Sequence, residues 1–430
     1  MITLGTFLLS LPISSADGTQ IPFLNALFSA TSATCVTGLT VMDTGTTFSI
    51  FGQIVMIILV QVGGIGFMTM ASLIALALNK RISLRERLIL QEALNYGSIN
   101  GVVRLVKMVI LYSLLVELAG ALLFGIHFFF SLHLSLGRTI YFGIFHSVSL
   151  FNNAGFDLMG TVRDPFSGMA PYVNDPYINI VTMGLVFLGG VGFIVLSDLI
   201  EFPNTRKISL HSKVVLSATS ILIIVGTVAI FAMEFSNPNT LKPLHIGGKF
   251  LASMFQSVTT RSGGVSTLDI GAFHESTQFL LILLMFIGAA PGSTGGGIKI
   301  TTFVLLLSAV HSMIRGREDV ILFRKRIAKS VVYKAITLTL LSLLLVILFS
   351  MLLSLTEHQD FLTILFESTS AFGTTGLSMG LTTNLTAFGK VWIICLMFLG
   401  RIGPLTLIYA LSRNQKKDLF NYPEGRIIIG

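Results

Sequence analysis

The sequence predicts an all-α integral membrane protein in which helix, short polar segment and helix occur four times around one axis. Three observations predict this fold. The 430 residues are 53% hydrophobic and only 11% charged, with a mean hydropathy of +0.84. Seven long apolar runs reach about the 20 residues that a helix needs to cross a bilayer. A Ser/Thr-rich segment that ends at glycine recurs four times between these runs.

The apolar runs predict membrane-spanning helices near 50–78, 105–131, 178–200, 214–235, 276–311, 330–355 and 387–411. The first apolar element, Ile2 to Leu11, is too short to span alone, and we expect a shortened first helix there. The whole chain, 1–430, is expected to form one transmembrane domain. Its four repeats are expected at approximately 1–79, 80–203, 204–314 and 315–430, the last ending in a tail at 412–430.

Basic residues predict the orientation in the membrane. If each polar segment lies between two antiparallel helices, all four face one side, and 20 of the 28 Lys and Arg lie on the opposite side. Cytoplasmic loops are enriched in Lys and Arg. We therefore expect a multi-pass protein of the plasma membrane, in contact with the lipid bilayer, with both termini cytoplasmic. The repeats are then parallel rather than inverted. In loops 80–87 and 315–329 we interpret the basic residues as this orientation signal. The alternative is that these loops dock a soluble partner or anionic lipid head groups.

The four polar segments share one pattern. They read FSATSATCVTG from Phe28, FHSVSLFNNAG from Phe145, FQSVTTRSGG from Phe255 and FESTSAFGTTG from Phe366. The distance from Phe to Gly is 10, 10, 9 and 10 residues, so the third copy is one residue shorter. Irregular backbone at membrane depth is tolerated only inside protein or along a water-filled cavity. Four such segments around one axis predict a pore.

The chemistry of these segments suits a cation. Rings of backbone carbonyls can replace the hydration shell of an ion, and glycine best tolerates the angles that turn carbonyls inward. The short helices would direct the negative ends of their dipoles at the axis. The expected filter, which binds a cation mostly through backbone carbonyls, consists of Thr34, Cys35, Val36, Thr37, Gly38, Phe151, Asn152, Asn153, Ala154, Gly155, Thr260, Arg261, Ser262, Gly263, Gly264, Phe372, Gly373, Thr374, Thr375 and Gly376.

A second motif, GAAPGSTGGG, lies within the run 276–311, which is too long for one straight crossing at about 1.5 Å per residue. Its glycines and proline predict a helix break at mid-membrane. Arg401 is a charge at membrane depth, which marks a pathway or a partner, and we expect loop carbonyls to bind it. A glycine-rich kink without function is the alternative. The expected gate consists of Gly288, Ala289, Ala290, Pro291, Gly292, Ser293, Thr294, Gly295, Gly296, Gly297 and Arg401.

Other polar residues have two interpretations each. Arg261 would repel cations if it pointed inward, so we expect it to point behind the filter and to donate to pore-helix carbonyls. Asp43, Asp157 and Asp269 follow filter glycines; we expect them to cap turns or helices, with attraction of cations to the mouth as the alternative. The second helices share QVGGIGF, FLGGVGF, FIGAAPG and FLGRIGP. Small residues in such motifs let helices pack closely, which is compatible with a pore-lining role.

The segments TCVTGLT, FNNAGF, TRSGGV, FGTTGL and STGGGIK resemble those of the Trk/Ktr/HKT superfamily of potassium transporters, and within it the membrane subunits of Ktr systems. The resemblance covers the chain apart from the shortened first helix. It implies a potassium-channel-like fold and potassium uptake, often stimulated by sodium, with no covalently bound cofactor. It also implies a homodimer with one pore per subunit, in which the tail contributes to the interface. A cytosolic nucleotide-binding regulatory subunit, a KtrA-type ring, would carry the nucleotide.

Other classes of function fit less well. No GxxxxGK[ST] sequence occurs, which disfavours an ATP-driven pump; neither an enzymatic activity nor a nucleic-acid partner is expected. An alternating-access cation symporter is the main alternative, because broken helices also build such sites. Parallel fourfold repeats with polar segments favour the pore, whereas inverted repeats would favour the symporter. A non-conducting membrane scaffold would leave the four polar segments unexplained.

Overall fold

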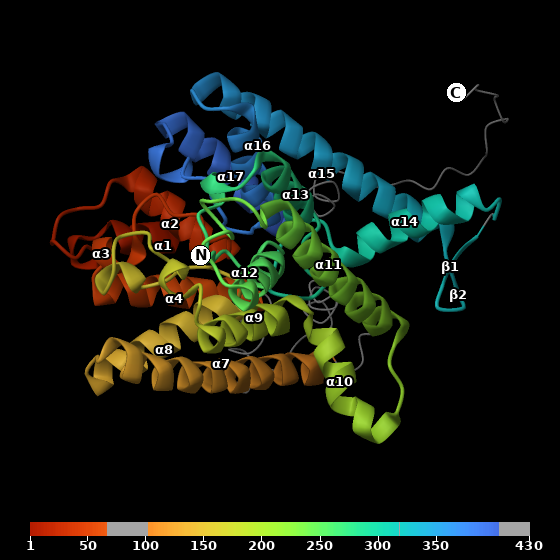
Figure 1. Cartoon of the computed structure of the whole chain (residues 1–430), viewed down its shortest axis with the longest axis horizontal. Helices are drawn as coiled ribbons and strands as arrows, with labels where there is room; N and C mark the ends of the chain where they lie inside the picture. Colours follow the sequence, from red (N-terminus) through yellow and green to blue (C-terminus); the bar gives the residue numbers. More distant parts are fainter. Residues whose placement is uncertain (67–101, 318, 404–430) are drawn as a thin grey trace.

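The computed structural model describes residues 1–66, 102–317 and 319–403 (Figure 1). Within these ranges the fold is helical apart from one antiparallel hairpin of β1 (Val320–Leu322) and β2 (Lys325–Ile327). The helices fall into four successive units, each with a first helix, a short helix and a second helix. The expectations for loop 80–87, the boundary at 79, the tail 412–430 and the ends of the helices near 50–78 and 387–411 lie outside the described residues.

The units have these bounds. Unit 1 contains α1 (Ile2–Ser10), η1 (Pro12–Ser14), α2 (Phe23–Cys35), α3 (Thr44–Thr47) and α4 (Ile50–Ile65). Unit 2 contains α7 (Val102–Leu132), α8 (Leu136–Phe151), η2 (Met159–Thr161), η3 (Ala170–Tyr172), α9 (Pro176–Gly190) and α10 (Phe193–Thr205). Unit 3 contains α11 (Leu210–Glu234), α12 (Ile246–Thr259), η4 (Ile270–Ala272), α13 (Glu275–Phe286) and α14 (Ile300–Ile314). Unit 4 contains α15 (Lys329–Thr356), α16 (Phe361–Gly373), η5 (Thr382–Asn384) and α17 (Ala387–Ile402).

Three first helices are long and apolar enough to cross a membrane: Val106–Leu132 in α7, α11 and α15. They expose large apolar side chains, such as Leu114 (55%), Ile224 (62%) and Leu344 (60%). Water would disfavour so much apolar surface, whereas lipid accommodates it. These surfaces are therefore suited to the hydrocarbon of a bilayer. The first helix of unit 1, α1, has nine residues and is as short as the sequence predicts.

Among the described residues, each second helix ends or breaks at its glycine-rich motif. Gly66, Gly192 and Gly403, the last glycines of the motifs in units 1, 2 and 4, have φ values of +95°, +94° and +85°. Glycine takes a positive φ without the steric cost that a Cβ would add. The prediction of one helix near 178–200 is therefore wrong, because α9 and α10 meet at Gly192 with a bend of 99°. In unit 3 the break is longer, as expected, and separates α13 from α14.

The units pack into a closed ring. The second helix of each unit contacts the short helix of the next: α4 packs on α8, α9 on α12, α13 on α16, and α17 on α2. The last contact joins unit 4 to unit 1. This arrangement places the ends of all four short helices around one axis.

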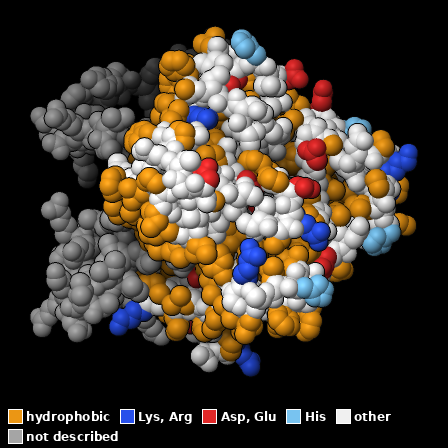
Figure 2. All heavy atoms as spheres, turned by 90° about the vertical axis from the view of Figure 1, so that its left-hand side faces the viewer, with side chains coloured by type: hydrophobic (Ala, Val, Ile, Leu, Met, Phe, Trp, Pro, Cys, Tyr) orange, Lys and Arg blue, Asp and Glu red, His pale blue; other side chains and the backbone are white. Residues whose placement is uncertain are grey.

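The two ends of the molecule differ. In Figure 1, α3 lies at one end, and α10, the end of α14 and the hairpin lie at the other. Figure 2 looks onto the α3 end, where several acidic side chains lie among hydrophobic ones. The opposite end carries α10, which is followed directly by Arg206 and Lys207, and the hairpin with Arg324 to Arg326.

Candidate ion pathway at the centre of the helix ring

Four glycines, one from each unit, meet at the axis of the ring. Gly38, Gly155, Gly264 and Gly376 have φ values of +89°, +72°, +69° and +85°. A Cβ on Gly155 would lie 2.7 Å from Cα of Gly264, and a Cβ on Gly376 would lie 3.0 Å from Cα of Gly264 and 3.1 Å from Cα of Gly38. A Cβ on Gly38 would lie 3.5 Å from Cα of Gly155. Backbone conformation and crowding both require glycine, and we call these residues the glycine ring.

A second ring of unusual backbone angles lies two residues earlier. Val36, Asn153, Ser262 and Thr374 have φ values of +57°, +60°, +114° and +48°. None is glycine, and Val and Thr are β-branched, so each left-handed conformation costs on the order of 1–3 kcal/mol. Such strain persists where the surrounding structure enforces it, typically at functional sites. The repetition in all four units indicates one shared backbone geometry.

Helix ends produce this geometry. The N–H groups of Thr37, Ala154 and Thr375 donate to carbonyls five residues earlier, at 2.8, 2.8 and 2.9 Å, in the pattern of a Schellman motif. In unit 3 the N–H of Gly263 instead donates to Thr259, four residues earlier, at 2.6 Å. The missing residue in the third copy of the pattern thus shortens the helix end.

The expected filter ranges begin within the short helices. Thr34 and Cys35 belong to α2, Phe151 ends α8, and Phe372 and Gly373 belong to α16; Thr260 caps α12. Three of these residues have carbonyls that pack directly against glycines of the second helices. A Cβ on Gly63, Gly189 or Gly400 would overlap the carbonyl oxygen of Thr34, Phe151 or Phe372, respectively. Close packing therefore accounts for the first glycine of this motif in units 1, 2 and 4.

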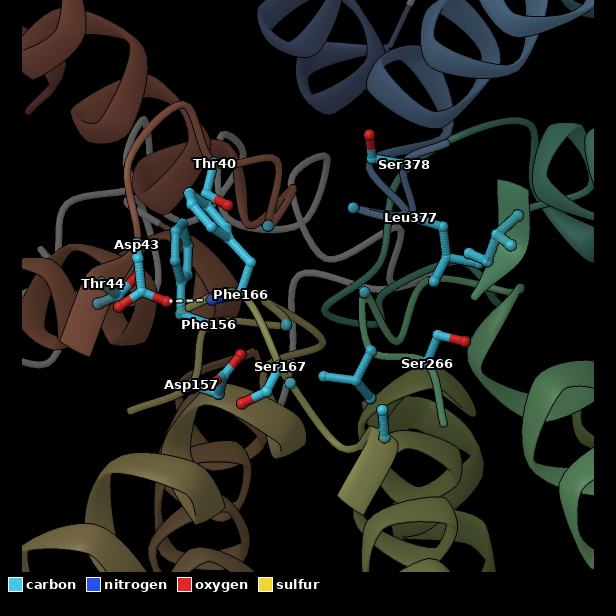
Figure 3. Close-up of a pocket in the computed structure, with 18 of the residues that line it drawn as sticks. Thr40, Asp43, Thr44, Phe156, Asp157, Phe166, Ser167, Ser266, Leu377 and Ser378 are labelled. Atoms are coloured by element: carbon cyan, nitrogen blue, oxygen red, sulfur yellow. Dashed lines mark hydrogen bonds between the residues drawn. The ribbon is translucent and has the colours of Figure 1, made fainter. Parts of the chain in front are cut away.

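A cavity of about 360 Å³ opens above the glycine ring (Figure 3). All four ring glycines line it, and all four units contribute residues. The outer loop after α8 also lines it through Phe166 and Ser167. The backbone N–H of Phe166 donates to Asp43 at 2.8 Å, so this loop of unit 2 is fastened to unit 1 across the cavity rim.

The three aspartates after the filter cap local structure and also line this cavity. Asp43 accepts from the N–H of Thr46 at the start of α3 (2.8 Å), Asp157 from Met159 (2.8 Å) and Asp269 from Gly271 at the start of η4 (2.9 Å). Capping is thus confirmed, and the alternative role at the mouth is compatible with it. Burial raises the pKa of Asp157 to about 6, the Met159 N–H opposes this, and the neighbouring Asp43 carboxylate adds to it.

The helix break of unit 3 forms a loop on the other side of the glycine ring. Three backbone hydrogen bonds fasten it to the break between α9 and α10: Ala290 N–H to Gly190 O (3.0 Å), Thr294 N–H to Gly189 O (3.2 Å), and Phe193 N–H to Gly292 O (2.9 Å). The loop also reaches the strained residues. The Thr294 hydroxyl bonds the Asn153 amide at 2.7 Å, and the N–H of Gly296 donates to the Thr374 hydroxyl at 2.8 Å.

The filter segment of unit 3 also contacts this loop, because a Cβ on Gly295 would lie 2.5 Å from the Ser262 hydroxyl oxygen. The loop thus touches the strained residues of units 2, 3 and 4. It lies directly against the filter segments.

Two basic side chains, Arg401 and Lys299, donate hydrogen bonds to this loop. Arg401 donates from Nη1 to the carbonyl of Thr294, as expected for a loop carbonyl. Its Nη2 donates to the carbonyls of Gly63 and Gly64 at the end of α4, which the sequence did not indicate. Lys299, outside the expected gate, donates to Gly295 O at 2.6 Å. Its position in an apolar run, directly after the glycines, was the available signal.

Arg261 points behind the filter, as expected, but its hydrogen-bond partner differs. It is 8% exposed, and Nη2 donates to the Thr219 hydroxyl of α11 at 3.4 Å rather than to pore-helix carbonyls. A small cavity of about 20 Å³ lies beside it and is also lined by Ile223 and Val258. The charge therefore lies away from the glycine ring.

Three buried side chains at one position of the short helices fasten the segment that leaves the filter. Glu367 accepts from the Ser378 hydroxyl and from the N–H of Met379 (3.2 Å). His146 Nε2 accepts from the N–H of Leu158 at 3.3 Å, and Gln256 Oε1 from the Ser266 hydroxyl at 2.9 Å. Because the three residues differ in type, the sequence pattern did not reveal this shared role.

Comparisons with known proteins agree with this geometry. A family model described as TrkH, cation transport protein, matches residues 3–421. The chain is 44% identical over 429 residues to Ktr system potassium uptake protein B of Bacillus subtilis, covering 100% of this chain and 94% of that one. It is 38% identical over 436 residues to the potassium/sodium uptake protein NtpJ of Enterococcus hirae, covering 100% and 95%. The crystal structure of the potassium transporter TrkH from Vibrio parahaemolyticus matches 96% of this chain and 83% of its own, with a TM-score of 0.75 at 18% identity, a likeness of fold alone.

Proposed function

The chain belongs to the TrkH family of cation transport proteins, and on this premise we propose that it takes up potassium across the plasma membrane through a pore on the axis of the helix ring. In this proposal the four units serve as the four expected repeats. One observation carries the proposal: segments far apart in sequence bring four positive-φ glycines into contact at one axis. A chain that packed these helices only for stability would need no such strained, repeated geometry.

The filter consists of the glycine ring and the residues that immediately precede it in each unit. The carbonyl ends of the four short helices converge there, and their dipoles favour a cation. The hydroxyls of Thr37 and Thr375 make no hydrogen bond within the part of the chain that the structure describes, so their lone pairs can serve a cation. The carbonyls of Thr34, Phe151 and Phe372 pack against the glycines of the second helices, so the proposed ligands lie nearer the ring.

The loop Gly288–Gly297 with Arg401 is the gate of this pore. Its contacts with strained residues of three units support a position across the path. Arg401 and Lys299 add positive charge at that point, which raises the energy of a passing cation. Opening requires the loop to leave the filter segments and Arg401 to release Thr294 or the end of α4.

Flux into liposomes tests the function. Purified protein should carry potassium and rubidium down their own gradients and sodium more slowly, without a second ion gradient. Protein-free liposomes and liposomes with a Gly264→Ser variant serve as controls. Potassium movement that stops unless a sodium gradient is present would instead support the alternating-access symporter.

The mouth of the pore should respond to pH through Asp157. Because its pKa is raised to about 6, Asp157 is charged at pH 7.5 and becomes neutral as the external pH falls through 6. Asp43, at the start of α3, is the charged group that adds to this shift. Loss of one negative charge at the mouth should raise the half-saturation for potassium roughly twofold. Asp157→Asn should show the higher value at pH 7.5 and lose this step; a variant that keeps the step would assign it to another group.

We also propose a homodimer whose basic end docks a cytosolic regulatory subunit, as the resemblance implies. The hairpin presents Arg324 in its turn and Lys325 at the start of β2, while Arg326 is paired with Asp319 at 3.0 Å. Replacing Arg324 and Lys325 by glutamate should weaken co-purification with a KtrA-type ring, and adding Arg326→Glu should weaken it further. Lys242→Glu, in the loop between α11 and α12, is the matched control. Undiminished binding of the triple variant would place the docking site elsewhere.

A further inference from the structure

Glu117 is a buried acid inside the membrane domain. It lies in the apolar span Val106–Leu132 of α7 and is 5% exposed. Acidic residues within such spans are rare and usually functional. The sequence patterns that predicted the filter and the gate lie on the short and second helices, so neither includes this residue of a first helix.

The carboxylate of Glu117 joins three parts of the structure. Its Oε2 accepts from Gln61 Nε2 of α4 at 3.0 Å, and its Oε1 accepts from Asn152 Nδ2 at 3.1 Å. Asn152 Nδ2 also donates to Gln61 Oε1 at 2.7 Å. Asn152 follows α8 directly and is three residues before Gly155 of the glycine ring. We call Gln61, Glu117 and Asn152 the amide–carboxylate triangle.

Unit 3 shows that packing alone does not require an acid at this place. The Ser147 hydroxyl donates to the backbone carbonyl of Glu117 at 2.6 Å, and the equivalent Ser257 donates to that of Ile223 at 2.9 Å. Ile223 therefore stands in unit 3 where Glu117 stands in unit 2. Beside Ile223 lies Arg261, the counterpart of Asn152, with a small cavity between helices rather than a hydrogen-bonded triangle.

The triangle also adjoins the gate. Gln61 is two residues before Gly63, and the carbonyls of Gly63 and Gly64 accept from Arg401. The side chain of Asn152 packs against Gly64 so closely that a Cβ there would overlap it. The end of α4 thus contacts a filter segment on one side and the arginine of the gate on the other.

We propose that Glu117 is a positioning residue that sets the geometry of the unit 2 filter segment through Asn152 and Gln61. The proposal rests on the proposed function of the filter. Removal of the carboxylate leaves the Gln61 amide without its acceptor and releases one contact of Asn152, in a buried place where unpaired polar groups are costly. The filter segment then adopts a wider range of positions. Binding and discrimination of ions suffer before the maximal rate does.

Flux measurements on Glu117→Ala, Glu117→Gln and Ile223→Ala test this proposal. Glu117→Ala should raise the half-saturation for potassium about tenfold and admit more sodium, with a smaller change in maximal flux. Glu117→Gln keeps the length and one acceptor oxygen and should restore most of the affinity. Ile223→Ala removes partly buried apolar atoms at the equivalent place in unit 3 and should leave both quantities near those of the unchanged protein.

Two results would overturn the proposal. One is a folded Glu117→Ala protein with unchanged half-saturation and sodium rejection; the other is the same loss of affinity in Ile223→Ala, which would indicate general loosening. If Glu117→Ala does not fold, Gln61→Ala opens the triangle from the other side and should raise the half-saturation in the same direction. Gly264→Ser distinguishes failure of the proposed filter from failure of the proposed role of Glu117. If Gly264→Ser alters selectivity and the triangle variants do not, only the role of Glu117 is wrong.

Discussion

Replacement of Gly264 by serine is expected to abolish selective potassium uptake while leaving the protein folded in the membrane. The φ of Gly264 is +69°, and a Cβ there would lie 2.9 Å from Cα of Gly155 and 3.0 Å from the carbonyl oxygen of Thr375. Both neighbours are backbone atoms of other units, so relief requires filter segments to shift. A left-handed conformation alone costs about 1–2 kcal/mol in a residue with a Cβ. We expect potassium affinity to fall by more than about tenfold and sodium rejection to weaken.

A matched control separates crowding from backbone strain. Gly380 also has a positive φ, +91°, but a Cβ there would meet no atom within 4 Å. Gly380→Ser should therefore retain uptake and selectivity. Potassium half-saturation and rubidium-to-sodium flux ratios in liposomes provide the measurements. If Gly264→Ser transports potassium with unchanged half-saturation and sodium rejection, the glycine ring is not the filter.

The helices and the glycine ring could be predicted because their signals are local. Long apolar runs and a Phe-to-Gly spacing of 10, 10, 9 and 10 residues need no knowledge of contacts between units. The break at Gly192 had a local signal as well, since the third glycine of QVGGIG and FLGGVG recurs. The prediction of one helix at 178–200 followed the hydropathy of the run and did not take that glycine into account.

Other features of the site depend on contacts that a single sequence does not reveal. Val36 and Thr374 are β-branched, so no residue preference predicts their positive φ; they take it as the left-handed caps of α2 and α16. The amide–carboxylate triangle joins Gln61 to Asn152 across 91 positions of the chain. Arg401 reaches the end of α4 across more than 300. These partners become neighbours only once the units have packed into a ring.

Deletion of Ser293 to Gly296 is expected to raise potassium flux and to make it less dependent on a regulatory subunit. These residues include Thr294, which bonds Asn153, Gly189 and Arg401, and Gly296, which donates to Thr374. Without them the loop cannot contact the strained residues of units 2 and 4. The path below the glycine ring then stays open.

The hydrogen bonds explain why the loop needs assistance to open. Three backbone hydrogen bonds, Arg401 and Lys299 fasten it. Each bond contributes a net 0.5–1.5 kcal/mol, roughly, and more where a charge takes part. A partner that pulls on α14, which follows the loop directly, can offset part of this sum. Deletion removes most of it at once, so the variant should conduct with or without the partner.

Arg401→Ala should raise flux in the same direction but less far, because the backbone bonds of the loop to Gly189 and Gly190 remain. Arg401→Lys keeps the charge but loses the paired donors that reach Thr294 and Gly63 together, and should fall between. If the arginine acts through the loop, adding Arg401→Ala to the deletion should raise flux little further, since residues that share one contact are not additive. The measurement is potassium flux, with and without the regulatory subunit, for the two arginine variants, the deletion variant and the deletion combined with Arg401→Ala. A deletion variant that inserts normally but shows unchanged or lower flux would reject the gate, because a loop that does not obstruct the path gains nothing from removal.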